Sequence, residues 1–210
     1  MILKIPFYKN DELGVQCMQV AMKTALKYFL DKDYELDELD KLTGRKGNYA
    51  IYTSQIVTVL HDLGLAVKFY SKESLEPYLG GESFIRGHFG KDAENILKVT
   101  DIPVVVDSIK KLLDYDIFEK KIISIEDIKE NISKGYVVMV LIDYNKIMGR
   151  EGFYQGHFVI VTGFEADNIY FHESGSNDAQ LNRKISAEIF INAMNANGTD
   201  NDCVIVSGKR

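Results

Sequence analysis

The spacing of hydrophobic residues changes about two thirds of the way along the chain. From Cys17 to Leu30 apolar residues recur at steps of three and four, which predicts a helix. The same spacing predicts helices over about residues 33–42, from Thr53 or Ser54 to Gly64, and after the capping-box pattern that begins at Ser124. The intervening stretch, about 71–121, is also mostly helical in pattern.

After residue 135 the pattern becomes typical of strands. Residues 136–142 form a continuous apolar run, as in a central strand that is buried on both faces. Residues 157–164 form a second run, and the turn signal at 165–168 leads into a third run. Helices followed by an antiparallel sheet indicate an α+β fold. The remaining predicted elements are a short helix and two strands, at about residues 186–194, 65–70 and 203–207.

Length and composition narrow the class of protein. The chain has 210 residues, 46% of them hydrophobic, which predicts a single domain over 1–210 with a mainly helical insertion at about 71–121. The net charge of -6 and the lack of a basic patch argue against a nucleic-acid partner. No apolar run approaches the ~20 residues of a membrane helix, so we expect no membrane partner. The opening residues do not resemble a signal peptide, which predicts a cytoplasmic protein. The oligomeric state is left open.

Cys17 is the first candidate for chemistry, because it stands directly before the apolar pattern of its predicted helix. A helix N-terminus carries a partial positive charge and free N–H groups, and both favour a thiolate. The same N–H groups can stabilise the oxyanion that forms during acyl transfer. The alternative is that Cys17 is a small residue of the core.

His157 begins the second apolar strand and follows Cys17 by 140 residues, within the range seen between nucleophile and base in papain-type enzymes. The turn at 165–168 forms a hairpin that places residue 172 or 173 beside residue 157. Glu173 or His172 is therefore the candidate that orients the imidazole. The alternatives are a structural histidine and an exposed, charged strand end.

The sequence gives less support for a metal or cofactor site than for a thiol nucleophile. Cys17, His88, His157 and His172 are enough in number for a zinc site, but no two of them have the close spacing of a ligand pair. The chain contains neither a phosphate-binding glycine loop nor a nucleotide fingerprint. We therefore predict no metal and no cofactor.

Taken together, the sequence resembles the peptidases that process double-glycine bacteriocin leaders, and above all their stand-alone relatives. The N-terminal likeness is Pro6-Phe7-Tyr8, a loop, and then Cys17 on a helix that ends in Lys27-Tyr28-Phe29. The second signature is Gly156-His157-Phe158, an apolar strand to Gly163, a turn, and a strand that ends in His172-Glu173-Ser174. The segment from Ser124 to Asp143 matches the family's helix and strand before the histidine.

The resemblance implies a papain-like fold and thiol-dependent acyl transfer. Cys17 is then the nucleophile, His157 the base and Glu173 the orienting group, with a peptide or amide as substrate. The family's upstream glutamine, an oxyanion donor, is absent, so Asn10 or Gln16 is the candidate donor. Glu173 stands where the family has aspartate. The leading hypothesis is a cysteine peptidase or amidase, and the alternatives are an acyltransferase with the same Cys-His pair and an inactive binding module of the same fold.

Overall fold

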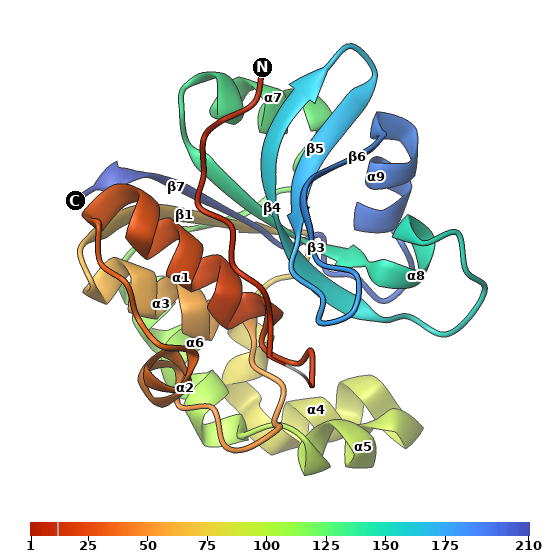
Figure 1. The fold of residues 1–210 in the computed structure, drawn as a ribbon. Helices are drawn as coiled ribbons and strands as arrows, with labels where there is room; N and C mark the ends of the chain where they lie inside the picture. The colour runs from red at the N-terminus through yellow and green to blue at the C-terminus, as the bar shows by residue number, and fades with distance from the viewer. Residues whose placement is uncertain (12) are drawn as a thin grey trace.

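The protein consists of a sheet with helices packed against both faces, as a computed structural model shows (Figure 1). The structure describes residues 1–11 and 13–210. The helices are α1 (Cys17–Leu30), α2 (Leu36–Thr43), α3 (Thr53–Asp62), α4 (Gly81–Phe89), α5 (Ala93–Lys98), α6 (Ile102–Asp114), α7 (Ile125–Ser133), α8 (Tyr144–Ile147) and α9 (Ala187–Met194), with the 3-10 helices η1 (Glu76–Gly80) and η2 (Gly90–Asp92). The strands are β1 (Leu65–Ser71), β2 (Phe118–Lys120), β3 (Val137–Asp143), β4 (Gly156–Glu165), β5 (Asn168–Glu173), β6 (Gln180–Ser186) and β7 (Cys203–Lys209).

The strands described in the structure form one seven-stranded sheet in the order β2-β1-β7-β3-β4-β5-β6. Neighbouring strands are antiparallel, except for the edge pair β1–β2, which is parallel. β3 and β4 are paired through six residues, and this register places His157 opposite Ile142, one residue pair before the end. The histidine therefore lies at the margin of the sheet, next to the loops.

Two hydrophobic cores lie on opposite faces of the sheet. Val137, Met139 and Ile160 contribute to the core that is shared with α1, α3 and α6. Val138 and Val140, their neighbours on β3, contribute to the core beneath α7 and α9. Successive side chains of a strand point to opposite faces, so a strand that is covered on both sides must be apolar throughout. This requirement explains the continuous apolar run of β3.

The structure confirms the predicted α+β layout and most of its elements. The predicted helix from Cys17 to Leu30 has these same bounds, and Ser124 caps α7 in a capping box with Asp127. Strands β2 and β6 and helix α8 were not predicted, since short edge elements carry little hydrophobic pattern. The single domain with an insertion at 71–121 stays a prediction. In the described part of the chain, no helix has the length and apolar character to cross a membrane.

Candidate active site

The start of α1 is fixed by a turn built from side-chain oxygens. The Asn10 Oδ1 atom accepts hydrogen bonds from the backbone N–H groups of Gln16 and Asp11, both at 3.0 Å. Gly14, at φ +69°, donates its N–H to the Asp11 carboxylate at 2.8 Å. The Asn10 N–H donates to the Ser174 carbonyl at 2.8 Å, which holds this turn against the end of β5. The helix therefore begins at Cys17, beside the strand end that carries Glu173.

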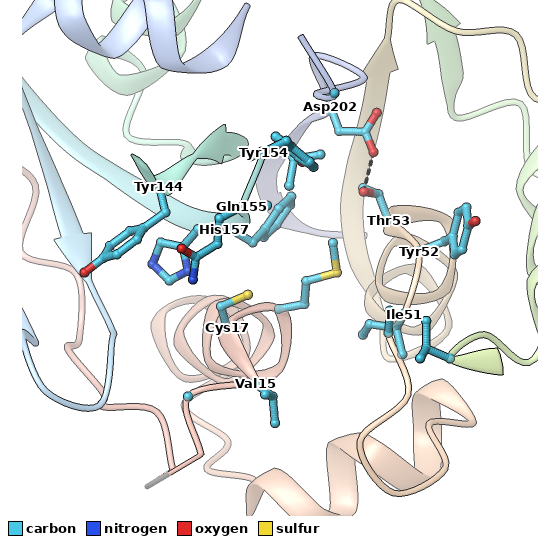
Figure 2. Close-up of a pocket in the computed structure, with 18 of the residues that line it drawn as sticks. Val15, Cys17, Ile51, Tyr52, Thr53, Tyr144, Tyr154, Gln155, His157 and Asp202 are labelled. Carbon is cyan, nitrogen blue, oxygen red and sulfur yellow. Dashed lines mark hydrogen bonds between the residues drawn. The ribbon is translucent and has the colours of Figure 1, made fainter. Parts of the chain in front are cut away.

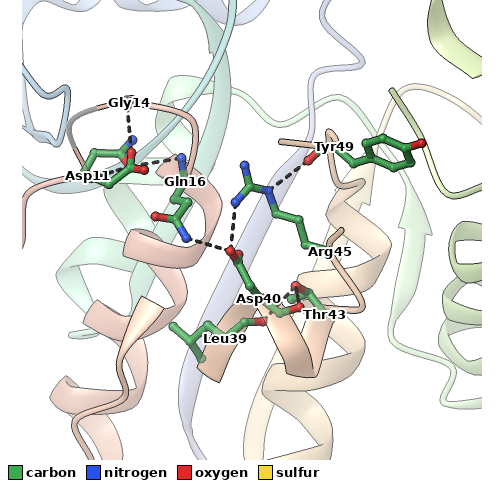
Figure 3. A network of polar contacts seen from close by, with 9 residues as sticks. Asp11, Gly14, Gln16, Leu39, Asp40, Thr43, Arg45 and Tyr49 are labelled. Carbon is green, nitrogen blue, oxygen red and sulfur yellow. Dashed lines mark hydrogen bonds and ion pairs between the residues drawn. The ribbon is translucent and has the colours of Figure 1, made fainter. Parts of the chain in front are cut away.

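Gln16 is engaged in a different network, which ties α1 to α2 (Figure 3). Its Nε2 atom donates to Asp40 Oδ2 at 2.8 Å, and Arg45 donates to the same oxygen at 2.9 Å. Arg45 Nε also donates to the Tyr49 carbonyl at 2.9 Å. In this arrangement the Gln16 amide is turned toward α2 and does not reach the thiol. The structure thus does not bring Gln16 into the site as an oxyanion donor.

Asn10, the other candidate donor, lies next to the site but not in it. Its Oδ1 atom is used by the turn, and its Nδ2 atom is buried without a hydrogen-bond partner among the described residues. The side chains that the structure describes as lining the cleft do not include Asn10. A role in oxyanion binding therefore remains a prediction for this residue.

Cys17 lies at the first position of α1 and is half-buried. Burial raises the pKa of its thiol, but a hydrogen bond and the charge of His157 act in the opposite direction. The backbone N–H groups of Phe158 and Met18 also stabilise the thiolate. The net result is a pKa below the usual value of a cysteine, as a nucleophilic thiol requires.

His157 joins Cys17 to Glu173. Its Nε2 atom lies 2.7 Å from Glu173 Oε1, so Nδ1 is the ring atom left for the thiol. Burial lowers the pKa of His157, but the interactions with Cys17 and Glu173 outweigh it and raise the pKa above its ordinary value. Glu173 is fully buried, and its Oε1 also accepts the Gly175 N–H at 2.9 Å. The three side chains predicted from the sequence are thus connected, Cys17 to His157 and His157 to Glu173.

His172 points away from Cys17, His157 and Glu173. Its Nε2 atom donates to the Ile5 carbonyl at 3.2 Å, and Nδ1 accepts the Asn182 N–H at 3.3 Å. Burial lowers the pKa of His172, which matches this neutral, singly protonated ring. The ring also contacts Phe7 edge-on, with centroids 5.2 Å apart. The structure therefore places Glu173, and not His172, against His157, while His172 holds the N-terminal segment to the sheet.

A cleft of about 1130 Å³ opens above Cys17 and His157. Figure 2 shows Cys17 between His157 and Tyr144 on one side and Thr53 and Asp202 on the other. The cleft is lined by residues 13–15, 17–19, 48–53, 154–158 and 175–178, together with single residues near 78, 89, 96–100, 141–150 and 198–202. The candidate nucleophile is therefore open to a ligand several residues long.

Sequence reasoning missed two side chains in this cleft. Tyr144 contacts His157 edge-on, with ring centroids 5.3 Å apart, and its hydroxyl donates to Asp178. Gln19 is 1% exposed, and its Nε2 atom has no partner in the described part of the chain. Tyr144 directly follows the observed strand β3, a position typical of site residues, whereas Gln19 lies within a helix and has no such signal.

This fold is that of the papain-like C39 cysteine peptidases, as the comparison with solved structures shows. A C39-like peptidase from Bacillus anthracis matches with a TM-score of 0.57 and 12% identity over 100% of this chain and 98% of that chain. A double-glycine motif protease from an AMS/PCAT transporter, solved with a leader peptide, gives 0.50 and 14% over 98% and 93%. The peptidase domain of Streptococcus ComA, a bifunctional ABC transporter, gives 0.50 and 10% over 99% of both chains.

The chain belongs to the guanylylate cyclase family, whose family model matches residues 8–206. No curated protein matches the chain significantly. The family's name and the peptidase fold point to different reactions. The choice between them therefore depends on the chemistry of the site.

Proposed function

We propose that the protein is a thiol-dependent hydrolase that cleaves a peptide or amide bond through an acyl-enzyme on Cys17. The observation that carries this proposal is the contact of Cys17 with His157 and of His157 with Glu173. In this arrangement the pKa of the thiol is lowered and the pKa of the imidazole is raised. Perturbed titratable groups that face a cleft are typical of catalytic sites. The papain-like fold supports the same reading.

In the proposed mechanism the Cys17 thiolate attacks the substrate carbonyl carbon. The free N–H groups at the start of α1 stabilise the oxyanion that forms. The His157 imidazolium then gives its proton to the leaving amine, and the C–N bond breaks to leave a thioester. Next, His157 removes a proton from water, whose oxygen attacks the thioester; the C–S bond breaks, which releases the acid and restores the Cys17 thiolate beside the His157 imidazolium. Glu173 orients the ring and stabilises its charged form.

The experiment that tests this proposal is the pH dependence of iodoacetamide alkylation, measured by mass spectrometry at each cysteine separately. We expect Cys17 to react well below the ~8.5 of an unperturbed thiol. His157→Ala should remove this reactivity at low pH. An unreactive or ordinary Cys17 would instead favour the inactive binding module. A product assay with an added amine distinguishes hydrolysis from acyl transfer.

Cyclisation of GTP is the second reaction to test, because the family's name suggests it. The charged side chains that line the cleft include three aspartates, Asp178, Asp200 and Asp202, against Arg150. A triphosphate carries several negative charges, and Arg150 is the one Lys or Arg side chain among the described residues that line the cleft, so the cleft has little positive charge to hold the phosphates. We expect no cyclic GMP from GTP with magnesium or manganese. Formation of cyclic GMP that Cys17→Ala leaves intact would contradict our proposal.

A further inference from the structure

The cleft continues into a small inner pocket on the side of Asp202. This pocket has a volume of about 30 Å³, which matches one small polar group of the size of a water molecule. Cys17 and His157 do not line it, and Figure 2 shows Asp202 and Thr53 across the opening from His157. The side chains that belong to both the cleft and the inner pocket are Tyr52, Thr53, Tyr78, Asp200 and Asp202.

Three carboxylates line this pocket, and the charge of Lys72 acts on two of them. Asp202 is 7% exposed and accepts a hydrogen bond from the Thr53 hydroxyl. Asp200 and Glu73 line the same pocket. The nearby Lys72 ammonium donates to the Thr199 carbonyl, and within residues 1–11 and 13–210 neither Asp200 nor Asp202 forms an ion pair. Within the described residues, the two aspartates therefore have no cation in direct contact.

Burial and the neighbouring Asp200 raise the pKa of Asp202 to about 7, although hydrogen bonds from Thr53 and Ser71 and the charge of Lys72 act against the shift. Burial also raises the pKa of Asp200. A bound cation would favour the ionised form of both groups. A cation that enters the pocket would therefore lower both pKa values, against the effect of burial.

Two tyrosines form part of the wall of the pocket. The rings of Tyr52 and Tyr78 lie with centroids 6.0 Å apart, and burial raises the pKa of both hydroxyls, so they stay neutral. Aromatic faces attract an organic cation through their quadrupole. In the described residues, no three His, Cys, Asp or Glu side chains are grouped as metal ligands. The combination of carboxylates and tyrosine rings therefore suits an organic ammonium group.

Gln19 is an independent sign that the same cleft holds a ligand. Its side chain lines the cleft and is almost fully buried, yet its Nε2 atom has no hydrogen-bond partner in the part of the chain that the structure describes. A buried donor without a partner is rare in native proteins, because its lost hydrogen bond to water is not replaced. The carbonyl of a bound peptide would complete its hydrogen bonding.

We propose that the inner pocket binds a primary ammonium group of the substrate, held between Asp200, Asp202 and the tyrosine rings, while Gln19 donates to a substrate carbonyl. This inference rests on the proposed hydrolase function for the identity of the substrate as a peptide. The ammonium group is either a lysine side chain or a free N-terminus. A primary ammonium group has three N–H donors, and the two carboxylates and the Thr53 hydroxyl provide an acceptor for each of them.

A binding experiment on Cys17→Ala protein tests the pocket without any hydrolysis. Amide chemical shifts are followed by NMR during titration with n-pentylammonium, and with 1-pentanol as the uncharged probe. We expect saturable shifts near Asp202 and Tyr78 with the ammonium only. When Asp202→Asn is added to the Cys17→Ala protein, its binding of n-pentylammonium should weaken at least tenfold. Asp200→Asn is the second variant in case Asp202→Asn does not fold, because the hydrogen bonds that Asp200 accepts from Ser71 and from the Lys72 N–H go to its backbone carbonyl, which this substitution keeps.

Asp107→Asn is the matched control, since it removes the same charge from an exposed residue that lines neither cavity. Equal weakening by Asp107→Asn, or equal binding of 1-pentanol, would overturn the proposal. An absence of binding by n-pentylammonium would overturn it as well.

A hydrolysis experiment then identifies the source of the ammonium group. N-acetylated fluorogenic peptide pools with lysine or norleucine at one fixed position are compared with the same pools bearing a free N-terminus. We expect a tenfold preference for lysine or for the free N-terminus, and Asp202→Asn should abolish this preference. Cleavage without either preference would overturn the ammonium site and leave the hydrolase standing. Binding of n-pentylammonium without cleavage of any pool would instead support the site and contradict the hydrolase.

Discussion

The two cysteines of this chain occupy opposite kinds of environment. Cys17 begins a helix, beside the imidazole of His157 and two backbone N–H groups, and its thiol pKa is lowered. Cys203 begins β7, an inner strand between β1 and β3, and is fully buried. Burial and the neighbouring Asp202 raise its thiol pKa well above the ordinary value. Both thiols lose water, so burial alone cannot explain why their acidities diverge.

The difference lies in what replaces the water. Desolvation is the largest single influence on the pKa of both thiols, and it raises both. At Cys17 a cationic hydrogen-bond partner and oriented N–H groups reverse the effect, whereas at Cys203 a carboxylate adds to it. A reactive thiol therefore requires an electropositive surrounding as well as a cleft.

Replacing each cysteine in turn gives the largest expected effect. Cys17→Ala should reduce kcat/KM on fluorogenic peptides by at least about 10³-fold, because the nucleophile is lost. Cys203→Ala should leave the turnover rate unchanged and lower the free energy of unfolding by about 1–2 kcal/mol, because it removes a buried sulfur. Steady-state kinetics and urea unfolding measure the two quantities. Equal losses of activity in the two variants would contradict the comparison.

Removing the imidazole should make the two thiols more alike. In His157→Ala, burial of Cys17 is no longer opposed by its main partner, so its thiol pKa should rise to or above the ordinary ~8.5. Alkylation of Cys17 across pH 5–10, read against Cys203 in the same sample, measures this change. A Cys17 that still reacts at low pH would show that the helix N-terminus alone activates it.

Glu173 offers a graded test of the same ion pair. Glu173→Gln keeps an oxygen for His157 Nε2 but loses the charge, which should lower the pKa of His157 by about 1–3 units. The alkaline limb of kcat/KM, where His157 loses its proton, should then move to lower pH. The acid limb, where the Cys17 thiolate gains a proton, should move less. We expect about a tenfold loss for Gln and about a hundredfold loss for Ala. If the pH profile of kcat/KM were the same in Glu173→Gln, Glu173→Ala and the unmodified protein, Glu173 would not orient His157.

Much of the fold was predictable because its elements carry strong patterns. The helix from Cys17 to Leu30 and the buried strands β3 and β4 have unambiguous periodicity, and the capping box at Ser124 marks its helix by side chain alone. Strand β6 is an exposed edge with mixed polar residues, so no period reveals it. The parallel pairing of β2 with β1 depends on tertiary contacts, which a local pattern does not contain.

The candidate site was predictable only in part for a related reason. Cys17, His157 and Glu173 stand at element ends, where residue type and spacing are informative. The hydrogen-bond partners of Gln16 and His172 could not be predicted, because each partner lies far away in the sequence. Gln16 finds Asp40, and His172 finds Ile5. The inner pocket is likewise assembled from distant parts of the chain, among them α3, η1 and the segment before β7.

Gln16 provides the smallest expected effect and separates a structural role from a catalytic one. Gln16→Ala removes one hydrogen bond to Asp40, but Arg45 still pairs with the same carboxylate oxygen. The free energy of unfolding should therefore fall by only about 1 kcal/mol, as for an ordinary hydrogen bond. If the amide were an oxyanion donor, kcat would fall about 10²–10³-fold while stability changed equally little. We expect kcat and the alkylation profile of Cys17 to stay unchanged, because the amide faces α2 rather than the thiol. Urea unfolding and steady-state kinetics on the same preparation decide between these outcomes.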